Sequence, residues 1–381
     1  MKIVYDARTI NNSLTGVGNY SLSIIKNLLE IDKDNSYYCL CNSTAILGRE
    51  LNNYKNVRFI QVAPSNEDHP SNELWENGEL LKMLEDLKCD IFHGPAYLIP
   101  WKKKKSLKTK FVLTIHDLSF LRFPLFFPPK FSTYLKWLLN RTIYAADIIL
   151  ADSLSTKSDI IFSYKIEKSD NIEVVYCGAS DKFYKMNEVE LSQKAQQYNL
   201  PEKYFLSVGT IEPRKNHIKA LQIFEQLKIE NNIPYKLIIV GGNGWQSEHI
   251  LNDIKASPFI NDVIIKGFVS DEELNIIYNK ASVLFYFSHY EGFGIPLLEA
   301  MKCGCPVIAA KNSSIPEVVG ETGLLFDMKE DEPIKKEISK LILGKEYSDK
   351  LSQISLNQSN NFSWQSSAQK ILDIFNYLNK Q

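Results

Sequence analysis

The sequence predicts an α/β protein made of two doubly wound domains, and three observations support this. Its 381 residues are more than a single hydrophobic core usually holds. Short runs rich in β-branched and aromatic residues alternate with amphipathic segments. These runs are apolar on both faces, which is typical of parallel strands covered by helices on each side. The predicted strands are 2–6, 90–94, 110–116, 147–152, 204–209, 235–241, 262–267, 282–287 and 306–310.

The domain boundary is predicted near residue 178. The segment "VVYCGAS" ends the first series of strands, a polar and helical stretch follows, and the second series begins at Tyr204. We therefore expect one Rossmann-like domain at 1–178 and another at 179–362. The amphipathic segment 363–381 begins with a capping serine and is expected to pack back on the first domain. Two such domains facing one another would leave a cleft at the carboxyl ends of their strands, where α/β sheets bind ligands.

Composition excludes some classes of function. The chain has 44 basic and 45 acidic residues, so its net charge of -1 argues against nucleic acid as a partner. The first residues read as a strand, and neither a secretory signal nor an apolar run of membrane-spanning length is found. The six cysteines are scattered without a C-x-x-C pair, as expected of reduced thiols. We expect a cytoplasmic protein.

The segment "SHYEGFGIPLLEAMKCGCP" (288–306) places two acids around a glycine loop and a helix start. A proline suits the first turn of a helix, and backbone N–H groups at a helix start can hold a phosphate. Glu299 is predicted in the first turn of this helix, and Glu291 before the loop. Carboxylates accept hydrogen bonds from hydroxyls, so this pattern favours a nucleotide-sugar. Alternatively, Glu299 only complements the helix dipole and Glu291 is solvated.

A second segment, "SVGTIEPRKNH" (207–217), places Arg214 and Lys215 just beyond a strand end. Two fixed cations there are suited to neutralising a diphosphate leaving group, although a surface Arg-Lys pair is the common alternative. The only D-x-D motif, at 32–34, is expected to be a polar loop, so no metal is expected. No cofactor is expected either.

Two features of the first domain are weaker signals. The glycine turn "TGVGNYS", with Gly16 and Gly18, follows the first strand and could approach a phosphate, or be a plain loop. His116 lies at the end of a strand in "TIHDLSF", where it could bind a sugar oxygen or be a satisfied core histidine. His93, at another strand end, is expected to be structural.

Taken together, these segments resemble glycosyltransferase family 4, whose members are retaining enzymes of the two-domain GT-B type. The similarity covers nearly the whole chain: "TGVGNYS", "TIHDLSFLRFP", "ADSLSTKSDI", "VGTIEPRKN", "GFVSDEEL" and "YEGFGIPLLEAMKCGCPVIAA" occur in the family's order. The last is similar to its E-x7-E signature. The combination is most similar to the mannosyltransferase branch, so GDP-mannose is the preferred donor. Glucose, N-acetylglucosamine and rhamnose donors remain open.

The resemblance implies a role for each matching position. Hydroxyls of the transferred sugar would contact Glu291, and the nucleotide ribose would contact Glu299. Lys215, with Arg214 nearby, would stabilise the diphosphate, and His116 would bind the sugar's far hydroxyl. Backbone groups would serve the rest: those of Gly292, Phe293 and Gly294 for the sugar and distal phosphate, those of Gly16 and Gly18 for the phosphates, and those of Phe268 and Val269 for the base.

The sequence departs from the family's pattern at Thr210, because many members have arginine directly after the strand-end glycine. Either Arg214 takes that role, or Lys215 holds the diphosphate with less help. The family pattern implies transfer with retention of anomeric configuration and without a metal. The leaving phosphate would take the acceptor's proton.

The acceptor is expected to be a glycan or a lipid-linked oligosaccharide in cell-surface polysaccharide synthesis. Six lysines in "WKKKKSLKTK" (101–110) lie near the aromatic segment 120–139, so peripheral contact with the inner face of the plasma membrane is one interpretation. A solvated loop beside an ordinary helix is the other. Two alternative functions are a sugar-nucleotide epimerase of similar architecture and a non-catalytic nucleotide-sugar-binding subunit.

Overall fold

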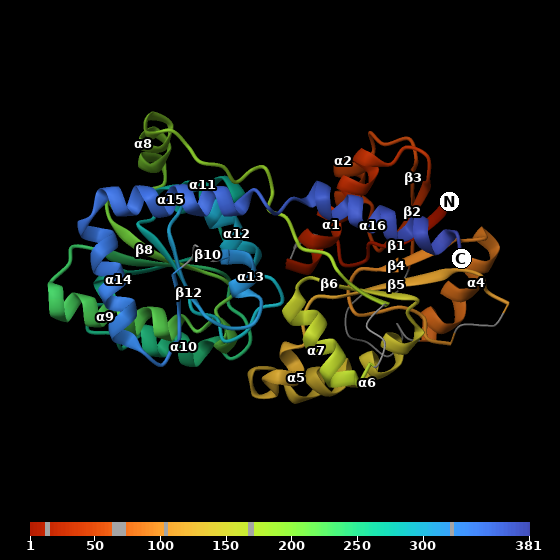
Figure 1. Ribbon diagram of the computed structural model, residues 1–381, viewed down its shortest axis with the longest axis horizontal. Coiled ribbons are helices and arrows are strands. Elements are labelled where there is room, and N and C mark those ends of the chain that lie inside the picture. The colour runs from red at the N-terminus through yellow and green to blue at the C-terminus, as the bar shows by residue number, and fades with distance from the viewer. Residues whose placement is uncertain (12–15, 63–73, 103–105, 167–170, 321–323) are drawn as a thin grey trace. The chain divides into compact units, whose positions relative to one another are not determined.

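A computed structural model of the chain describes residues 1–11, 16–62, 74–102, 106–166, 171–320 and 324–381. The chain forms two compact units, one of residues 1–178 with 363–381 and the other of residues 179–362 (Figure 1). Each unit contains one parallel sheet with helices on its faces. The predicted fold class, two Rossmann-like α/β domains, is confirmed.

The first unit is built on a seven-stranded parallel sheet in the order β3-β2-β1-β4-β5-β6-β7. Its strands are β1 (Lys2–Asp6), β2 (Ser36–Cys41), β3 (Val57–Gln61), β4 (Ile91–Gly94), β5 (Lys110–Ile115), β6 (Ile148–Ala151) and β7 (Ile172–Val174). Its helices are α1 (Gly16–Ile31), α2 (Ala45–Leu51), the π-helix η1 (Glu76–Leu80), α4 (Leu81–Leu87), α5 (Ser119–Arg122), η2 (Pro124–Phe126), α6 (Pro129–Ala145), α7 (Leu154–Tyr164) and α16 (Trp364–Asn379).

The last helix completes the first unit. In Figure 1, α16 lies beside α1, and the two helices pack together on one face of the sheet. The ring of Trp364 meets that of Tyr20 edge to face at 5.6 Å, and the Ser367 hydroxyl donates to the Tyr176 carbonyl at 2.5 Å. Gly178 allows the two chain segments to pass closely, because a Cβ there would lie 2.2 Å from the Trp364 nitrogen. The opposite face of the sheet packs on α4, α6 and α7.

The second unit is built on a six-stranded parallel sheet in the order β10-β9-β8-β11-β12-β13. Its strands are β8 (Tyr204–Val208), β9 (Lys236–Val240), β10 (Val263–Gly267), β11 (Val283–Tyr286), β12 (Val307–Ala310) and β13 (Leu324–Phe326). Its helices are α8 (Glu188–Gln197), η4 (Pro213–Lys215), α9 (His217–Asn231), α10 (Ser247–Lys255), η5 (Ile260–Asp262), α11 (Asp271–Lys280), α12 (Ile295–Lys302), α13 (Ile315–Val319), α14 (Asp331–Leu343) and α15 (Lys345–Ser359).

Apolar side chains hold the second unit together on both faces of its sheet. Helices α9, α10 and α14 pack their buried leucines, isoleucines and Phe224 against β8, β9 and β11. Helices α11 and α12 pack against each other, and the Tyr204 hydroxyl of β8 donates to the Ile277 carbonyl of α11 at 2.7 Å. Since all strands are parallel, the loops that follow them lie at one edge of the sheet. The predicted donor-binding residues of this unit lie in or just after these loops.

All six cysteines are free and buried. Among the residues that the structure describes, no helix has the length and apolar character that crossing a membrane requires.

Candidate functional site

A tight turn places Glu291 and the start of α12 at the carboxyl end of β11. Gly294 caps α12 with φ +105°, a left-handed conformation that favours glycine. The helix ends at Lys302, and beyond it Gly304 has φ +69° and donates its N–H to the Met301 carbonyl at 2.9 Å. The positive end of α12 therefore begins four positions after Glu291 in the chain.

Glu291 is the centre of a buried ion cluster. Its side chain accepts from Lys215 Nζ at 2.7 Å and from Arg214 Nη1 at 3.0 Å, and the residue is only 5% exposed. The hydroxyl of Ser314 donates to the Glu291 carbonyl at 2.9 Å. Burial raises the pKa of Glu291, but Lys215 and Arg214 outweigh burial and lower it to about 2. Glu291 is therefore ionised throughout the physiological range.

The turn η4 delivers both cations to Glu291. Arg214 Nη2 also lies 2.6 Å from a Glu212 oxygen, and Arg214 Nη1 donates to the Tyr290 carbonyl at 3.1 Å. Burial and the charge of Arg214 lower the pKa of Lys215, while Glu291 opposes them. Two cations and two carboxylates thus form a charge-balanced group, termed here the Glu291 cluster: Glu212, Arg214, Lys215 and Glu291. Thr210 is exposed, while the guanidinium of Arg214 lies beside Lys215 in this cluster.

Glu299 lies just beyond the first turn of α12, within which it was predicted. The helix begins at Ile295, so Glu299 is its fifth residue and lies beyond the first turn. The prediction of a first-turn position was wrong because the helix begins at Ile295, one residue before the proline. Tyr278 of α11 donates its hydroxyl hydrogen to Glu299 at 3.2 Å. Desolvation nevertheless raises the pKa of Glu299 to about 8.

This raised pKa predicts a pH-dependent stability. A carboxyl that titrates near 8 when folded and near 4.5 when unfolded binds more protons in the folded state between these pH values. Its contribution is therefore fully present below about pH 4.5 and is lost as the pH rises through 8. We expect Glu299→Gln to raise the melting temperature at pH 8 and to change it less at pH 5. Thermal unfolding at both values measures this, with exposed Glu248→Gln as control, and an equal shift at both would contradict it.

Phe268 and Val269 follow β10 at the same edge of the sheet. The strand ends at Gly267, which has φ +65°, and the Phe268 side chain beyond it is 85% exposed. Ser270 then caps α11 by accepting from the Glu273 N–H. An exposed aromatic ring at a strand end offers a face on which a base can stack.

The first unit contains the other predicted residues. Gly16 is the first residue of α1 and is exposed, whereas Gly18 is buried. Both glycines therefore lie within α1 and not in a turn, and Thr15, the first residue of that segment, lies outside the described part of the chain. His116 follows β5 and is buried, and its Nδ1 lies 2.8 Å from Asp152 Oδ2. His116 and the glycines thus belong to one unit, and the Glu291 cluster to the other.

His93 has the structural role predicted for it. Its Nε2 lies 2.9 Å from the Thr114 hydroxyl, and its ring packs edge to face on Tyr5 and Phe375. Burial lowers the pKa of His93 to about 3, with a smaller contribution from His116. A neutral, packed histidine is the result.

Sequence reasoning missed three charged groups at these strand ends. Asp152 and Glu212 are buried partners of predicted residues, and each follows a strand, which was a usable signal. Arg8, beyond β1, is buried with its Nη2 2.6 Å from Asp6 and 2.5 Å from Glu76, and its guanidinium lies over the Trp75 ring. Because Glu76 is distant in sequence, no local pattern indicates this pairing.

The D-x-D loop has a structural role. Asp32 accepts from the Tyr37 hydroxyl at 2.6 Å and from Asn35 Nδ2 at 2.7 Å, which joins α1 to β2. In the described ranges, no group of three or more histidine, cysteine or acidic residues could hold a metal ion.

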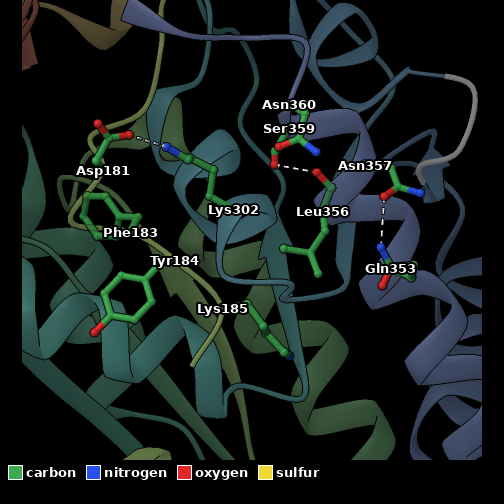
Figure 2. A pocket seen from close by; sticks show the side chains of 10 residues that line it. All are labelled: Asp181, Phe183, Tyr184, Lys185, Lys302, Gln353, Leu356, Asn357, Ser359 and Asn360. Atoms are coloured by element: carbon green, nitrogen blue, oxygen red, sulfur yellow. Dashed lines mark hydrogen bonds and ion pairs between the residues drawn. The ribbon is translucent and has the colours of Figure 1, made fainter. Parts of the chain in front are cut away.

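A pocket of about 270 Å³ opens in the second unit, away from the predicted donor-binding residues (Figure 2). The segment 181–185, the last residue of α12, and α15 with the residue that follows it line the pocket: Asp181, Phe183, Tyr184, Lys185, Lys302, Gln353, Leu356, Asn357, Ser359 and Asn360. Lys302 Nζ lies 3.1 Å from Asp181 Oδ1 across its rim. None of the predicted site residues lines this pocket.

Comparison with protein families covers most of the chain. A model described as Glycosyltransferase Family 4 matches residues 14–183, and one described as Glycosyl transferases group 1 matches residues 188–358. The O-antigen chain mannosyltransferase B of Escherichia coli is 28% identical, covering 99% of this chain and 100% of that protein. The O-antigen chain mannosyltransferase RfbU of Salmonella typhimurium is 31% identical over 58% of this chain and 57% of that one. The E. coli serotype-specific mannosyltransferase WbdA is 27% identical over 74% of this chain, which spans about a third (34%) of WbdA.

Solved structures share the fold at low sequence identity. The Anabaena protein HepE, in complex with UDP and glucose, has a TM-score of 0.75 at 18% identity, covering 99% of this chain and 100% of that one. WaaG, a glycosyltransferase involved in lipopolysaccharide biosynthesis, has a TM-score of 0.72 at 13% identity over 98% and 99% of the two chains. These likenesses show the two-domain architecture.

Proposed function

The chain belongs to glycosyltransferase family 4, and from this premise we propose that it transfers mannose from GDP-mannose to a glycan or lipid-linked acceptor of a cell-surface polysaccharide. The observation that carries the proposal is the Glu291 cluster, with its two cations beside the start of α12. A carboxylate that accepts from sugar hydroxyls and cations that pair with phosphate oxygens suit the two parts of a nucleotide-sugar. The relatives named as O-antigen mannosyltransferases favour mannose.

The proposed reaction retains the anomeric configuration and uses no metal. The acceptor hydroxyl bonds to the anomeric carbon on the face from which the diphosphate leaves, and the departing phosphate oxygen takes the hydroxyl proton. Lys215 and Arg214 neutralise the charge that grows on the diphosphate as the glycosidic bond breaks. Because these cations pair with Glu291 in the free protein, the donor must partly displace that pairing. NMR of the product that shows an inverted anomeric centre would refute retention.

A thermal-shift panel of GDP-, UDP-, ADP- and dTDP-sugars tests the donor. We expect GDP-mannose to give the largest stabilisation, because it is the proposed donor. A ligand at about 100 times its dissociation constant stabilises the folded state by about 2.7 kcal/mol, which a thermal shift detects. If no nucleotide-sugar raises the melting temperature, the proposed function is wrong. Incubation of GDP-mannose without an acceptor distinguishes transfer from epimerisation, since only an epimerase would convert the donor alone.

Contact with an anionic membrane is a further part of the proposal. The region 120–139 contains exposed or half-buried aromatic residues, Leu125 is 86% exposed, and Trp101 packs edge to face on Trp137. Lys102 is exposed beside them, while residues 103–105 lie outside the described part of the chain. Basic charge beside aromatic side chains is typical of peripheral membrane binding. Flotation with anionic liposomes should be lost on charge reversal at Lys102 to Lys105, and unchanged flotation would remove the membrane from the proposal.

A further inference from the structure

His116 and Asp152 form a pair at the carboxyl edge of the first sheet. They follow β5 and β6, which are neighbouring parallel strands, so their backbones lie side by side. His116 Nδ1 lies 2.8 Å from Asp152 Oδ2, and both residues are buried. Burial raises the pKa of Asp152, and His116 opposes that shift. When the carboxyl group is ionised it can only accept a hydrogen bond, so Nδ1 then carries the hydrogen.

The opposite nitrogen of His116 is left for another group. Nε2 is buried and makes no hydrogen bond of good geometry among the described residues, although the Pro95 backbone interacts with the imidazole and helps to raise its pKa. The ring cannot turn easily, because Tyr20 packs on it edge to face at 4.7 Å and Tyr97 at 5.7 Å. A buried polar atom without a partner is costly, and a ligand oxygen would relieve that cost.

The charges around His116 favour its protonated form. Burial lowers the pKa of His116, but Asp152 and Asp117 outweigh burial and the net shift is upward. The other titratable groups nearby are neutral. The pKa of His93 is lowered to about 3, so its imidazole carries no charge. Burial raises the pKa values of Tyr20 and Cys177 well above their usual range, so both stay protonated and uncharged. Protonation makes Nε2 a hydrogen-bond donor as well as Nδ1.

We propose that Asp152 is a positioning residue that holds His116 as an imidazolium, with Nε2–H presented to a hydroxyl oxygen of the transferred hexose. This inference rests on the proposed function and on the sugar contact that the family resemblance implies for His116. A fixed, charged donor aimed at one oxygen selects hexoses that have a hydroxyl at that position. A deoxy analogue would leave Nε2–H buried and unpaired, and such sites reject analogues that lack the hydroxyl.

The substitution Asp152→Asn tests the charge separately from the geometry, because its amide oxygen can still accept from Nδ1. We expect kcat with GDP-mannose at pH 7.5 to fall about 10- to 100-fold, the size of effect known for losing the carboxylate partner of a metal-bound histidine. Without the carboxylate, the pKa of the buried imidazole falls, so the loss of activity with rising pH should begin at lower pH than in the wild type. Asp152→Glu should restore part of the activity.

Asp159→Asn is the matched control, since Asp159 is a buried acid of α7 that pairs with Arg122 Nε at 3.5 Å. It should keep the wild-type pH profile. NMR titration of the His116 imidazole nitrogens gives a readout without turnover, and its midpoint should fall in Asp152→Asn. If the profile and the midpoint are both unchanged, Asp152 is only structural. If the midpoint falls but the wild type turns over no nucleotide-sugar, the pair stands and the proposed function fails.

Discussion

Replacing Glu291 by glutamine should strongly slow sugar transfer while strengthening the binding of nucleotide. The neutral amide accepts hydrogen bonds from sugar hydroxyls more weakly than the carboxylate does. We therefore expect kcat to fall about 100- to 1000-fold, as it does when a preorganised polar group is removed from an active site. In the free protein, Lys215 and Arg214 pair with Glu291 at 2.7 and 3.0 Å, so its loss frees Lys215 for the diphosphate, while Arg214 keeps its ion pair with Glu212. GDP should therefore bind more tightly to Glu291→Gln than to the wild type. Calorimetry with GDP and a transfer assay measure the two effects.

The same substitution should destabilise the protein without ligand. Removing one partner of a buried ion pair typically costs about 3 to 5 kcal/mol, because the other charges stay buried. GDP should recover part of that loss. Glu337→Gln is the matched control, since Glu337 is a similarly buried glutamate of α14 that pairs with Lys340. Weaker GDP binding by Glu291→Gln would show that Glu291 does not compete with phosphate for these cations.

Lys215→Met should lower kcat about 100- to 1000-fold, because the ammonium group is the fixed charge nearest to Glu291 and would neutralise the leaving diphosphate. Lys228→Met is the control, since Lys228 pairs with Asp262 at 2.6 Å elsewhere in the second unit. The double variant with Glu291→Gln should lose little more than either single variant, because residues that act as one unit are not additive. Additive losses would mean that the two side chains act independently.

The fold class was predictable because buried parallel strands leave continuous apolar runs in the sequence. The strands β2 and β3 were not predicted. In β3, "VRFIQ" mixes charged, polar and apolar residues because it is an edge strand whose side chains are half-buried or exposed. The strands β7 and β13 were not among the predicted strands either. Each is only three residues long, which is too short for its pattern to be distinguished from that of a loop.

The site was predictable only where its residues are close in the chain. The glycine loop and the start of α12 are read from one short segment, and so is the turn that holds Arg214 and Lys215. Lys215 and Glu291 were each predicted to belong to the site. Their direct pairing joins residues 76 positions apart and was not predicted. The pairing of His116 with Asp152 spans 36 positions and depends on the order of β5 and β6 in the sheet. Such contacts follow from topology, which a single sequence does not contain.

The packing of α16 against α1 has a consequence for synthesis on the ribosome. Residues 1–178 emerge before the second unit, yet one face of their sheet is covered by a helix that is translated after it. Until residues 363–381 leave the exit tunnel, the apolar side chains that α16 covers are exposed to solvent and to chaperones. The second unit is continuous in sequence, so all of its segments have been translated before residues 363–381. We therefore expect the first unit, most of which is translated before the second, to reach its native state last. This is the reverse of the usual order, in which the N-terminal domain folds first.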